Sequence, residues 1–269
     1  MKRKLNFLLK SRNASIIFED DSIIVIDKPA NLLVIPDRYN QSIPNLYHIL
    51  KGELGEIFVV HRIDKETSGV IVFAKNAMAH SNLNDQFENR QVEKTYCAIV
   101  NGTPAELQGK INTPITESQN HPGIMKVDLK RGKPSLTDYK VVESFNGYAF
   151  VAAAPKTGRM HQIRIHLASI GTPIMCDRIY GDGKPFFLSH IKTKYFSEGD
   201  EKPLLSRAAL HAESISFYYS AKNERVTFAA EIPKDMRSVL NYLRKFRAMA
   251  SSPDVIQLQT LKKSASANV

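Results

Sequence analysis

Short apolar runs, each about the length of a β-strand, recur along the chain and are separated by brief polar turns. This pattern predicts a sheet protein in which many neighbouring strands are joined by tight connections. The turn-forming residues at 19–22 predict that the first two runs form a hairpin. Strands are expected at 16–18, 23–26, 57–60, 70–73, 95–100, 137–142 and 148–153.

Three further segments predict helices. Asn76 can cap a helix that runs to about Arg90, with apolar side chains repeated on one face. Residues 161–171 first alternate like a strand, but their later apolar spacing is helical and Gly171 is placed to end a helix. Residues 234–249 combine an apolar face with a basic one. Strands interleaved with a few helices favour an α+β fold.

The length of the chain is compatible with one folded domain. It has 269 residues, of which 43% are hydrophobic, and this is enough to bury a substantial core. Residues 1–15 are predicted to be a basic N-terminal leader, 16–249 the domain, and 250–269 a loosely ordered tail. The interval 103–134 is rich in Gly, Pro, Asn and Lys, which predicts loops with little regular structure.

The charge of the chain indicates its partners. A formal net charge of +10 attracts polyanions before any specific contact forms, and nucleic acid is the first candidate. The alternative is a basic solvated surface with no such partner. No apolar stretch is long enough to be a signal sequence or to cross a membrane. Cys97 and Cys176 lie beside apolar residues, which suits reduced thiols, so a cytoplasmic location is expected.

Arg, His, Asp and Tyr are concentrated in three segments beside strand-like runs: HRIDKETSG at 61–69, EKTY at 93–96 and KTGRMHQIRIH at 156–166. In the first segment, Asp64 lies close to Arg62 and Lys65. An arginine brought near by the fold keeps such a carboxylate ionised, as a nucleophile or a general base requires.

Each of these residues also has a simpler interpretation. Asp64 could belong to a surface ion pair, and Tyr96 could be a core aromatic with its hydroxyl satisfied at the edge. Arg164 could lie on a solvated helix face, while His161 and His166 could be polar surface residues. Residue types alone leave both interpretations open.

Taken in order, the segments resemble the RluA family of RNA pseudouridine synthases. HRIDKETSG is similar to the catalytic loop of that family, in which the aspartate is followed three residues later by Thr-Ser-Gly. EKTY followed by CAIV resembles a second motif, and GRMHQIRIHLASIGTPIMCDRIYG resembles a third. RAALHA at 207–212 resembles a fourth, and the likeness spans roughly residues 16 to 235.

The resemblance implies a fold and an activity. The fold is a single catalytic domain around a mixed, largely antiparallel β-sheet with flanking helices and loops. The activity is conversion of a uridine to pseudouridine in a structured ribosomal or transfer RNA by base flipping. No metal or nucleotide cofactor is implied, in agreement with the lack of a phosphate-binding loop and of Cys/His ligand spacing. A monomer is the default expectation.

The resemblance also implies residue roles. Asp64 is expected to be the catalytic carboxylate, by attack on the sugar or by removal of a ribose proton. Arg164 is expected to pair with it, and Tyr96 to lie against the flipped uracil and to be a candidate for moving the proton from carbon 5. Arg62 is expected to fill the gap left by the base. Further RNA- or substrate-binding residues implied by the likeness are His61, Thr67, Arg159, His161 and Gln162.

The chain departs from the family pattern at Ile63, where leucine is usual, and at Met160, where a small hydroxyl residue is common. It also leaves no room at its N-terminus for the small RNA-binding domain of many relatives, so RNA affinity is expected from the catalytic domain itself. The candidate phosphate contacts are Lys2, Arg3, Lys4, Lys10, Arg12, Arg237, Arg244, Lys245 and Arg247.

Parts of the sequence also fit two other functions. A non-catalytic RNA-binding or RNA-folding protein on the same scaffold predicts loss of the catalytic set, yet Asp64, Tyr96 and Arg164 are all present. The HRID tetrapeptide resembles the catalytic loop of protein kinases, but a kinase needs a Gly-rich phosphate loop, a strand lysine and an Asp-Phe-Gly motif, which this sequence lacks.

Overall fold

The computed structural model describes residues 2–192, 195 and 199–249, so the predicted tail at 250–269 lies outside the described residues. Within these ranges the main sheet has ten strands. They are β1 (Ser15–Glu19), β2 (Ile23–Lys28), β3 (Phe58–Val59), β4 (Ser68–Ala74), β5 (Glu93–Asn101), β6 (Gln108–Asn112), β9 (Leu136–Phe145), β10 (Tyr148–Pro155), β11 (Leu210–Tyr219) and β12 (Glu224–Ala229).

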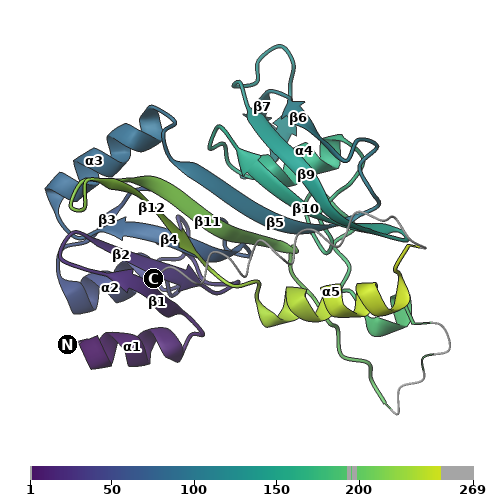
Figure 1. The fold of residues 1–269 in the computed structure, drawn as a ribbon, viewed down its shortest axis with the longest axis horizontal. Helices are drawn as coiled ribbons and strands as arrows, with labels where there is room; N and C mark the ends of the chain where they lie inside the picture. The colour runs from purple at the N-terminus through teal and green to yellow at the C-terminus, as the bar shows by residue number, and fades with distance from the viewer. Residues whose placement is uncertain (1, 193–194, 196–198, 250–269) are drawn as a thin grey trace.

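The strand order along the sheet is β1-β2-β4-β11-β5-β10-β9-β6, with β3 beside β4 and β12 beside β11 (Figure 1). Every described pairing in this sheet is antiparallel except that of β4 with β11, where His211 lies opposite Ser68 and Ala212 opposite Gly69. The predicted mixed, largely antiparallel sheet is therefore confirmed.

The described helices are α1 (Lys2–Lys10), α2 (Leu46–Leu54), α3 (Ala77–Glu88), α4 (Gln162–Ser169) and α5 (Lys234–Phe246). The Asn76 side chain accepts a hydrogen bond from the Ala79 N–H, as expected for an N-cap. The ambiguous segment at 161–171 forms α4, and Gly171 follows it with a φ of 78°, a conformation that glycine adopts without strain. None of the described helices combines the length and apolarity needed to span a membrane.

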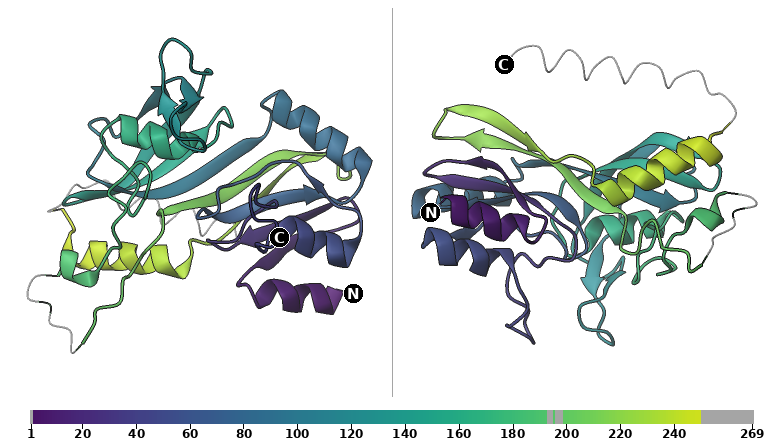
Figure 2. Two further views of the ribbon diagram at one scale, coloured as in Figure 1. Left: turned by 180° about the vertical axis from the view of Figure 1, so that it is seen from behind. Right: turned by 90° about the horizontal axis from the view of Figure 1, so that it is seen from below.

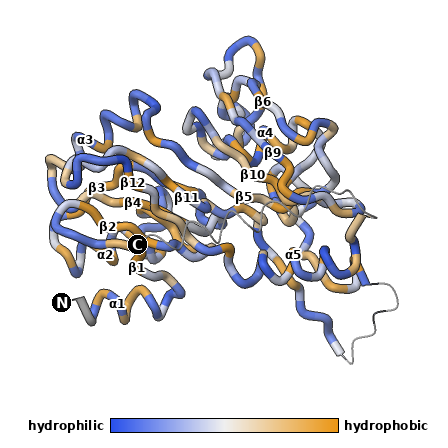
Figure 3. The backbone as a smooth tube through the Cα atoms, viewed as in Figure 1, coloured by the Kyte–Doolittle hydropathy of each residue, from blue (hydrophilic) through white to orange (hydrophobic). Residues whose placement is uncertain are grey.

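Two hydrophobic cores lie along the sheet. The first includes β2 and β4, and the second is formed around β10, α4 and α5. Figure 3 shows apolar residues gathered on the strands of both cores. Tyr96 on β5 packs at the edge of both cores, so the ring lies where they meet.

The segment predicted as a basic leader contains α1. Leu5 and Leu9, one helical turn apart, are fully buried in the first core, and the helix packs against α2 and β1 (Figure 2). Residues 2–15 therefore pack as part of the domain.

The prediction that 103–134 has little regular structure is wrong. This interval contains β6 and the hairpin of β7 (Ile115–Glu117) with β8 (Met125–Val127). These strands are short and mostly exposed, so they lack the apolar runs that identify a buried strand. The conformation of these strands depends on pairing with other strands, and β6 is held by its hydrogen bonds with β9.

Candidate active site

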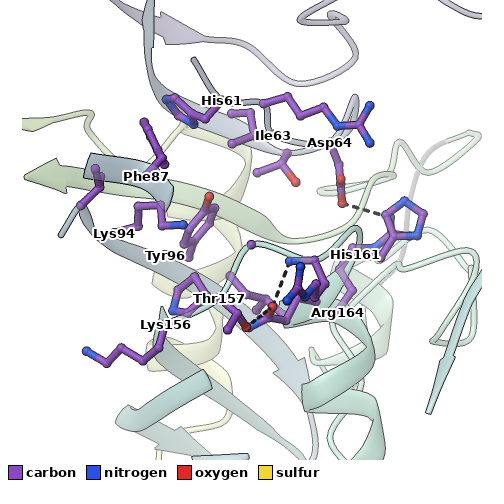
Figure 4. A pocket seen from close by; sticks show the side chains of 18 of the residues that line it. His61, Ile63, Asp64, Phe87, Lys94, Tyr96, Lys156, Thr157, His161 and Arg164 are labelled. Carbon is purple, nitrogen blue, oxygen red and sulfur yellow. Dashed lines mark hydrogen bonds and ion pairs between the residues drawn. The ribbon is translucent and has the colours of Figure 1, made fainter. Parts of the chain in front are cut away.

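A cleft of about 520 Å³ opens between the two cores, and three distant parts of the chain line it (Figure 4). The 61–69 loop supplies Asp64, β5 supplies Tyr96, and α4 supplies Arg164. The structure thus brings together the three residues that the sequence motifs marked as catalytic. Asp64 also borders a second hollow of about 240 Å³, which the 33–35 segment and Met160 line from the other side.

Asp64 lies in the loop between β3 and β4. A turn in this loop is closed by the Thr67 N–H, which donates to the Asp64 backbone carbonyl at 3.1 Å. Thr67 is 2% exposed and Ile63 is also buried, so apolar contacts hold both flanks of the turn. The Asp64 side chain remains 28% exposed at the cleft. Its carboxylate is accessible to a ligand while its backbone is fixed.

Lys28 anchors this loop from beneath. Its fully buried ammonium donates to the carbonyl oxygens of Pro29, Leu32 and Lys65 at 2.9, 2.8 and 3.1 Å. Burial, with the nearby positive charge of Arg207, lowers the pKa of Lys28 to about 7, but all three N–H donors have acceptors. The Lys28 ammonium therefore ties the end of β2 to the 61–69 loop.

Arg164 connects Asp64 to the interior. Its Nη1 lies 3.3 Å from Asp64 Oδ2, while Nε and Nη2 donate to the two carboxylate oxygens of Asp177 at 2.7 and 2.8 Å. Asp177 is fully buried and also accepts the backbone N–H groups of Ile179 and Tyr180. The guanidinium is therefore held in one orientation by a bidentate ion pair with Asp177, and its Nη1 group is left to contact Asp64.

The charges of Asp64, Arg164 and Asp177 stabilise one another. Burial alone lowers the pKa of Arg164, but the hydrogen bond and charge of Asp177, and then the charge of Asp64, raise it above its ordinary value. Burial likewise favours a protonated Asp177, yet Arg164 and two backbone N–H donors lower the pKa of that carboxyl. The pair is thus ionised, and a positive charge faces Asp64.

Tyr96 forms the floor of the cleft. Burial, together with the negative charge of Asp64, raises the pKa of the phenol, so the side chain is neutral at physiological pH. Its hydroxyl has no hydrogen-bonding partner among the described residues. An aromatic ring with a free polar edge suits a planar ligand that can both stack and accept or donate a hydrogen bond.

His161 lies at the N-terminus of α4 in the left-handed conformation, with φ of 56°. The Tyr180 hydroxyl accepts from the Met125 N–H at 2.8 Å and forms a hydrogen bond with His161 Nδ1 at 3.0 Å. Burial lowers the pKa of His161, and the ring is therefore neutral. The same Tyr180 ring lies 5.2 Å beneath the Arg164 guanidinium.

Gln162 was predicted to contact RNA, but its side chain is engaged inside the protein. The carbonyl oxygen accepts from Thr157 Oγ1 and the Arg159 N–H, and the amide donates to Leu136 O and Thr137 Oγ1, all at 2.7–3.0 Å. The residue is 4% exposed, and its hydrogen-bonding capacity is filled. Gln162 therefore shapes the 157–159 turn.

The other predicted RNA-binding residues divide between wall and rim. His61 stacks on Phe87 and accepts the Val72 N–H at 3.1 Å, and burial lowers its pKa to about 3, so it is a neutral wall residue. Arg62 is exposed at the rim. Arg159 also lines the cleft, and its buried Nε has no partner in the part of the chain that the structure describes.

Several predicted phosphate contacts are already engaged in intramolecular contacts. Lys4 pairs with Glu53 at 2.7 Å, and Arg244 pairs with Glu143 at 2.9 Å. Arg247 donates to the His190 carbonyl. The side chains of Lys2 and Arg3 lie outside what the structure describes. No group of three or more metal-ligating side chains is found in residues 2–192, 195 and 199–249.

The recessed carboxylate, the buried arginine and the basic rim define an enzyme that acts on nucleic acid. A family model described as RNA pseudouridylate synthase matches residues 22–169, more than half of the chain. The chain belongs to the RluA family of RNA pseudouridine synthases, which are isomerases that convert uridine to pseudouridine in RNA.

Similar proteins support this assignment. An uncharacterized RNA pseudouridine synthase of Chlorobaculum parvum is 38% identical over 251 residues, which cover 88% of this chain and 76% of the relative. Ribosomal large subunit pseudouridine synthase D of Neisseria meningitidis serogroup B is 34% identical, covering 93% of this chain and 67% of the relative. The fold is similar to that of human RNA pseudouridylate synthase domain containing 4, with a TM-score of 0.68, 24% identity and coverage of 93% and 100% of the two chains.

Sequence reasoning assigned no role to Lys28, Lys94, Asp177 or Tyr180, although the structure places all four at or beneath the cleft. Lys94, Asp177 and Tyr180 stand inside the quoted EKTY and DRIYG motifs. Their position inside those motifs was the only sequence signal for a role at the site. The role itself depends on partners from other parts of the chain, which the sequence does not show.

Proposed function

We propose that this enzyme isomerises a uridine of large-subunit ribosomal RNA, which enters the cleft as a flipped nucleotide and reacts at Asp64. The support for ribosomal RNA comes from relatives named ribosomal large subunit pseudouridine synthase C or D. Base flipping is supported by the depth of the cleft, since a carboxylate that is 28% exposed is out of reach of a stacked base.

The contact of Arg164 with Asp64 is the observation that carries the proposal. A buried guanidinium held by Asp177 has one remaining donor group, which lies 3.3 Å from the Asp64 carboxylate. This arrangement sets a fixed positive charge against the Asp64 carboxylate and orients it toward the space above Tyr96. A fixed, ionised carboxylate meets the requirement of either route, attack on carbon 1′ or removal of the ribose 2′ proton.

The overall reaction needs few groups because it is an isomerisation. The bond between N1 and carbon 1′ breaks, the uracil turns while it remains bound, and a bond forms between carbon 5 and carbon 1′. The proton on carbon 5 is lost and N1 gains one, so no electrons are exchanged with a cofactor. The neutral Tyr96 acts as the platform on which the detached uracil turns, and its phenol is the nearby group that can relay the proton.

RNA is held at the rim of the cleft. Arg62 is exposed beside Asp64 and is assigned to the space that the flipped base leaves in the RNA. Arg159 lines the cleft, and its guanidinium is suited to a phosphate oxygen next to the target nucleotide.

The first test replaces Asp64 by asparagine, with Asp85→Asn as control because Asp85 is an exposed carboxylate on α3. Pseudouridine formation is measured under single-turnover conditions on a ribosomal RNA substrate. Asp64→Asn is expected to lower the rate constant by at least about 10⁴-fold while RNA binding stays within a few-fold, whereas Asp85→Asn leaves both unchanged. Full activity of a folded Asp64→Asn protein overturns the proposed role.

The substrate class is tested by mapping pseudouridines in cells with and without the protein. Carbodiimide-dependent primer extension across the ribosomal and transfer RNAs is expected to reveal a missing site in large-subunit ribosomal RNA. A site missing only from transfer RNA contradicts the proposed substrate but leaves the isomerase activity standing.

A further inference from the structure

Lys94 lines the cleft, and its ammonium has no hydrogen-bond acceptor among the described residues. It lies two residues before Tyr96 on β5, so both side chains point to the same face of the strand and enter the cleft together (Figure 4). Its Nζ lies 5.7 Å from the centroid of the Phe87 ring and 3.9 Å from where a Cβ on Gly158 would be. The ammonium therefore reaches across the cleft toward the 157–159 turn.

No carboxylate or carbonyl oxygen among the described residues accepts a hydrogen bond from Lys94. The contrast with two other lysines is informative. Lys28 has three carbonyl acceptors, and Lys156, on the same cleft, is half exposed and lies 3.5 Å from Asp138. Burial lowers the pKa of Lys94, and its neighbour His61 is held neutral. The Lys94 side chain is partly buried and its ammonium lies over the face of the Phe87 ring, so the position of the ammonium suits an oxygen that arrives with the ligand.

The position of Lys94 relative to Tyr96 indicates which oxygen this is. Two residues along a strand are separated by about 7 Å, and Figure 4 shows Lys94 and Asp64 on opposite sides of Tyr96. A uracil that stacks on Tyr96 with its glycosidic carbon at Asp64 directs the opposite edge of the ring, with the carbon 4 carbonyl, toward Lys94. A phosphate oxygen of the RNA backbone is the other source of the same chemistry.

We propose that Lys94 is a further catalytic residue, whose ammonium donates a hydrogen bond to the carbon 4 carbonyl oxygen of the target uracil and stabilises the charge that the base acquires during the reaction. This inference rests on the proposed function of the cleft. When the bond between N1 and carbon 1′ breaks, its electron pair stays on N1 and is delocalised onto the two carbonyl oxygens. Lys94 transfers no proton in this step, and its interaction with the substrate strengthens as the negative charge develops.

This role does not depend on how Asp64 acts. In attack on the sugar and in removal of the ribose proton alike, the uracil leaves with the bonding pair. A fixed cation at the far edge also keeps the detached base in the cleft while it turns. Donors that stabilise a developing anion contribute about 100-fold or more to the rate in other enzymes, which sets the size of the expected effect.

The test compares Lys94→Met with Lys140→Met, because methionine keeps much of the length of the side chain and removes its charge, and Lys140 is exposed on β9 outside the lining of the cleft. Single-turnover rate constants and RNA dissociation constants are measured at several salt concentrations. Lys94→Met is expected to lower the rate constant by about 100-fold with the dissociation constant within about threefold of the parent. Lys140→Met is expected to leave the rate constant unchanged, with at most a small loss of RNA affinity from the lower net charge.

A substrate change locates the contact. RNA with 4-thiouridine at the target position replaces the carbonyl oxygen by sulfur, a weaker acceptor. The effect of Lys94→Met is expected to be at least about fivefold smaller on this RNA than on the uridine RNA, as for any interacting pair in a double-replacement cycle. Equal effects on both RNAs overturn the contact. A weaker affinity and smaller salt dependence of binding, with an unchanged rate, overturn it in favour of a phosphate ligand.

Folding is monitored by thermal unfolding, with Lys94→Gln as a second variant if the methionine protein does not fold. If Asp64→Asn is inactive and both Lys94 variants are fully active, only the role of Lys94 fails. If Asp64→Asn is active, the proposed function itself fails.

Discussion

At the scale of single residues, Arg164 determines the geometry of the cleft. The sequence offered two interpretations of it, a solvated helix face or a partner of Asp64, and the structure supports the second, since its side chain is 7% exposed. Asp177 in turn orients the guanidinium through two short hydrogen bonds. We therefore regard Asp177 as a positioning residue.

Replacement of Asp177 by asparagine is expected to lower the single-turnover rate constant by about 10 to 100-fold, because a small misplacement of Arg164 is transmitted to Asp64. RNA affinity is expected to stay within a few-fold, since Asp177 is fully buried. The control is Glu143→Gln, which removes the carboxylate partner of Arg244 away from the cleft and should leave the rate unchanged. Equal rates for Asp177→Asn and the parent protein would contradict the positioning role.

Asp27 makes stability depend on pH. Burial, with the charge of Glu231, raises the pKa of Asp27 to about 6, compared with about 3.9 in an unfolded chain. The folded state therefore holds this proton more tightly, and the associated stability is lost as the pH rises from about 4 through 6. In urea unfolding, Asp27→Asn is expected to gain about 1 kcal/mol relative to the parent at pH 8 and little at pH 4, after allowance for solvent screening. The same difference at both pH values would count against the assignment.

At the scale of elements, the junction of β4 and β11 positions the 61–69 loop that carries Asp64. Gly69 has a φ of 112°, and a Cβ on it would lie 2.1 Å from the carbonyl oxygen of Ala212. The two strands can therefore approach only because this residue has no side chain. Ser68 beside it is held by His211 Nδ1 at 3.0 Å.

Gly69→Ala is expected to destabilise the protein by more than about 3 kcal/mol, since backbone strain and overpacking both contribute. The control is Gly52→Ala in α2, where a new Cβ meets nothing within 4 Å. That change is expected to raise stability by about 0.5–1 kcal/mol through helix propensity. Chemical unfolding of both variants measures the difference, and a Gly69→Ala protein as stable as the parent would refute the steric argument.

The elements differ in how far local sequence determines them. The Asn76 cap and the termination at Gly171 were predicted, because each depends on neighbours a few residues away. Strands β6, β7 and β8 were missed because cross-strand partners hold them in place. Helix α1 was missed because the burial of Leu5 and Leu9 depends on α2 and β1.

At the scale of the whole molecule, the cleft lies where two cores meet, and the chain around it has a net charge of +10. Long-range attraction to RNA is therefore strong and sensitive to salt. RNA affinity is expected to fall by at least about tenfold between 50 and 200 mM salt, while the single-turnover rate at saturating enzyme stays constant. Filter binding measures the RNA affinity and quench-flow kinetics measure the single-turnover rate over this range of salt concentration. An RNA affinity that does not depend on salt would exclude a mainly electrostatic mode of binding.

The sequence by itself determined the family and the α+β class, and it predicted that Asp64, Tyr96 and Arg164 meet at one site, because motif order and strand-length patterns lie in contiguous residues. Only the tertiary structure decided that Gln162 turns inward, that Asp177 holds Arg164, and that the Lys94 ammonium has no protein acceptor among the described residues. The burial and the hydrogen-bond partners of these side chains come from segments far apart in the chain. Their effects on side-chain charge and orientation therefore exist only in the folded protein, where the two cores meet at the cleft.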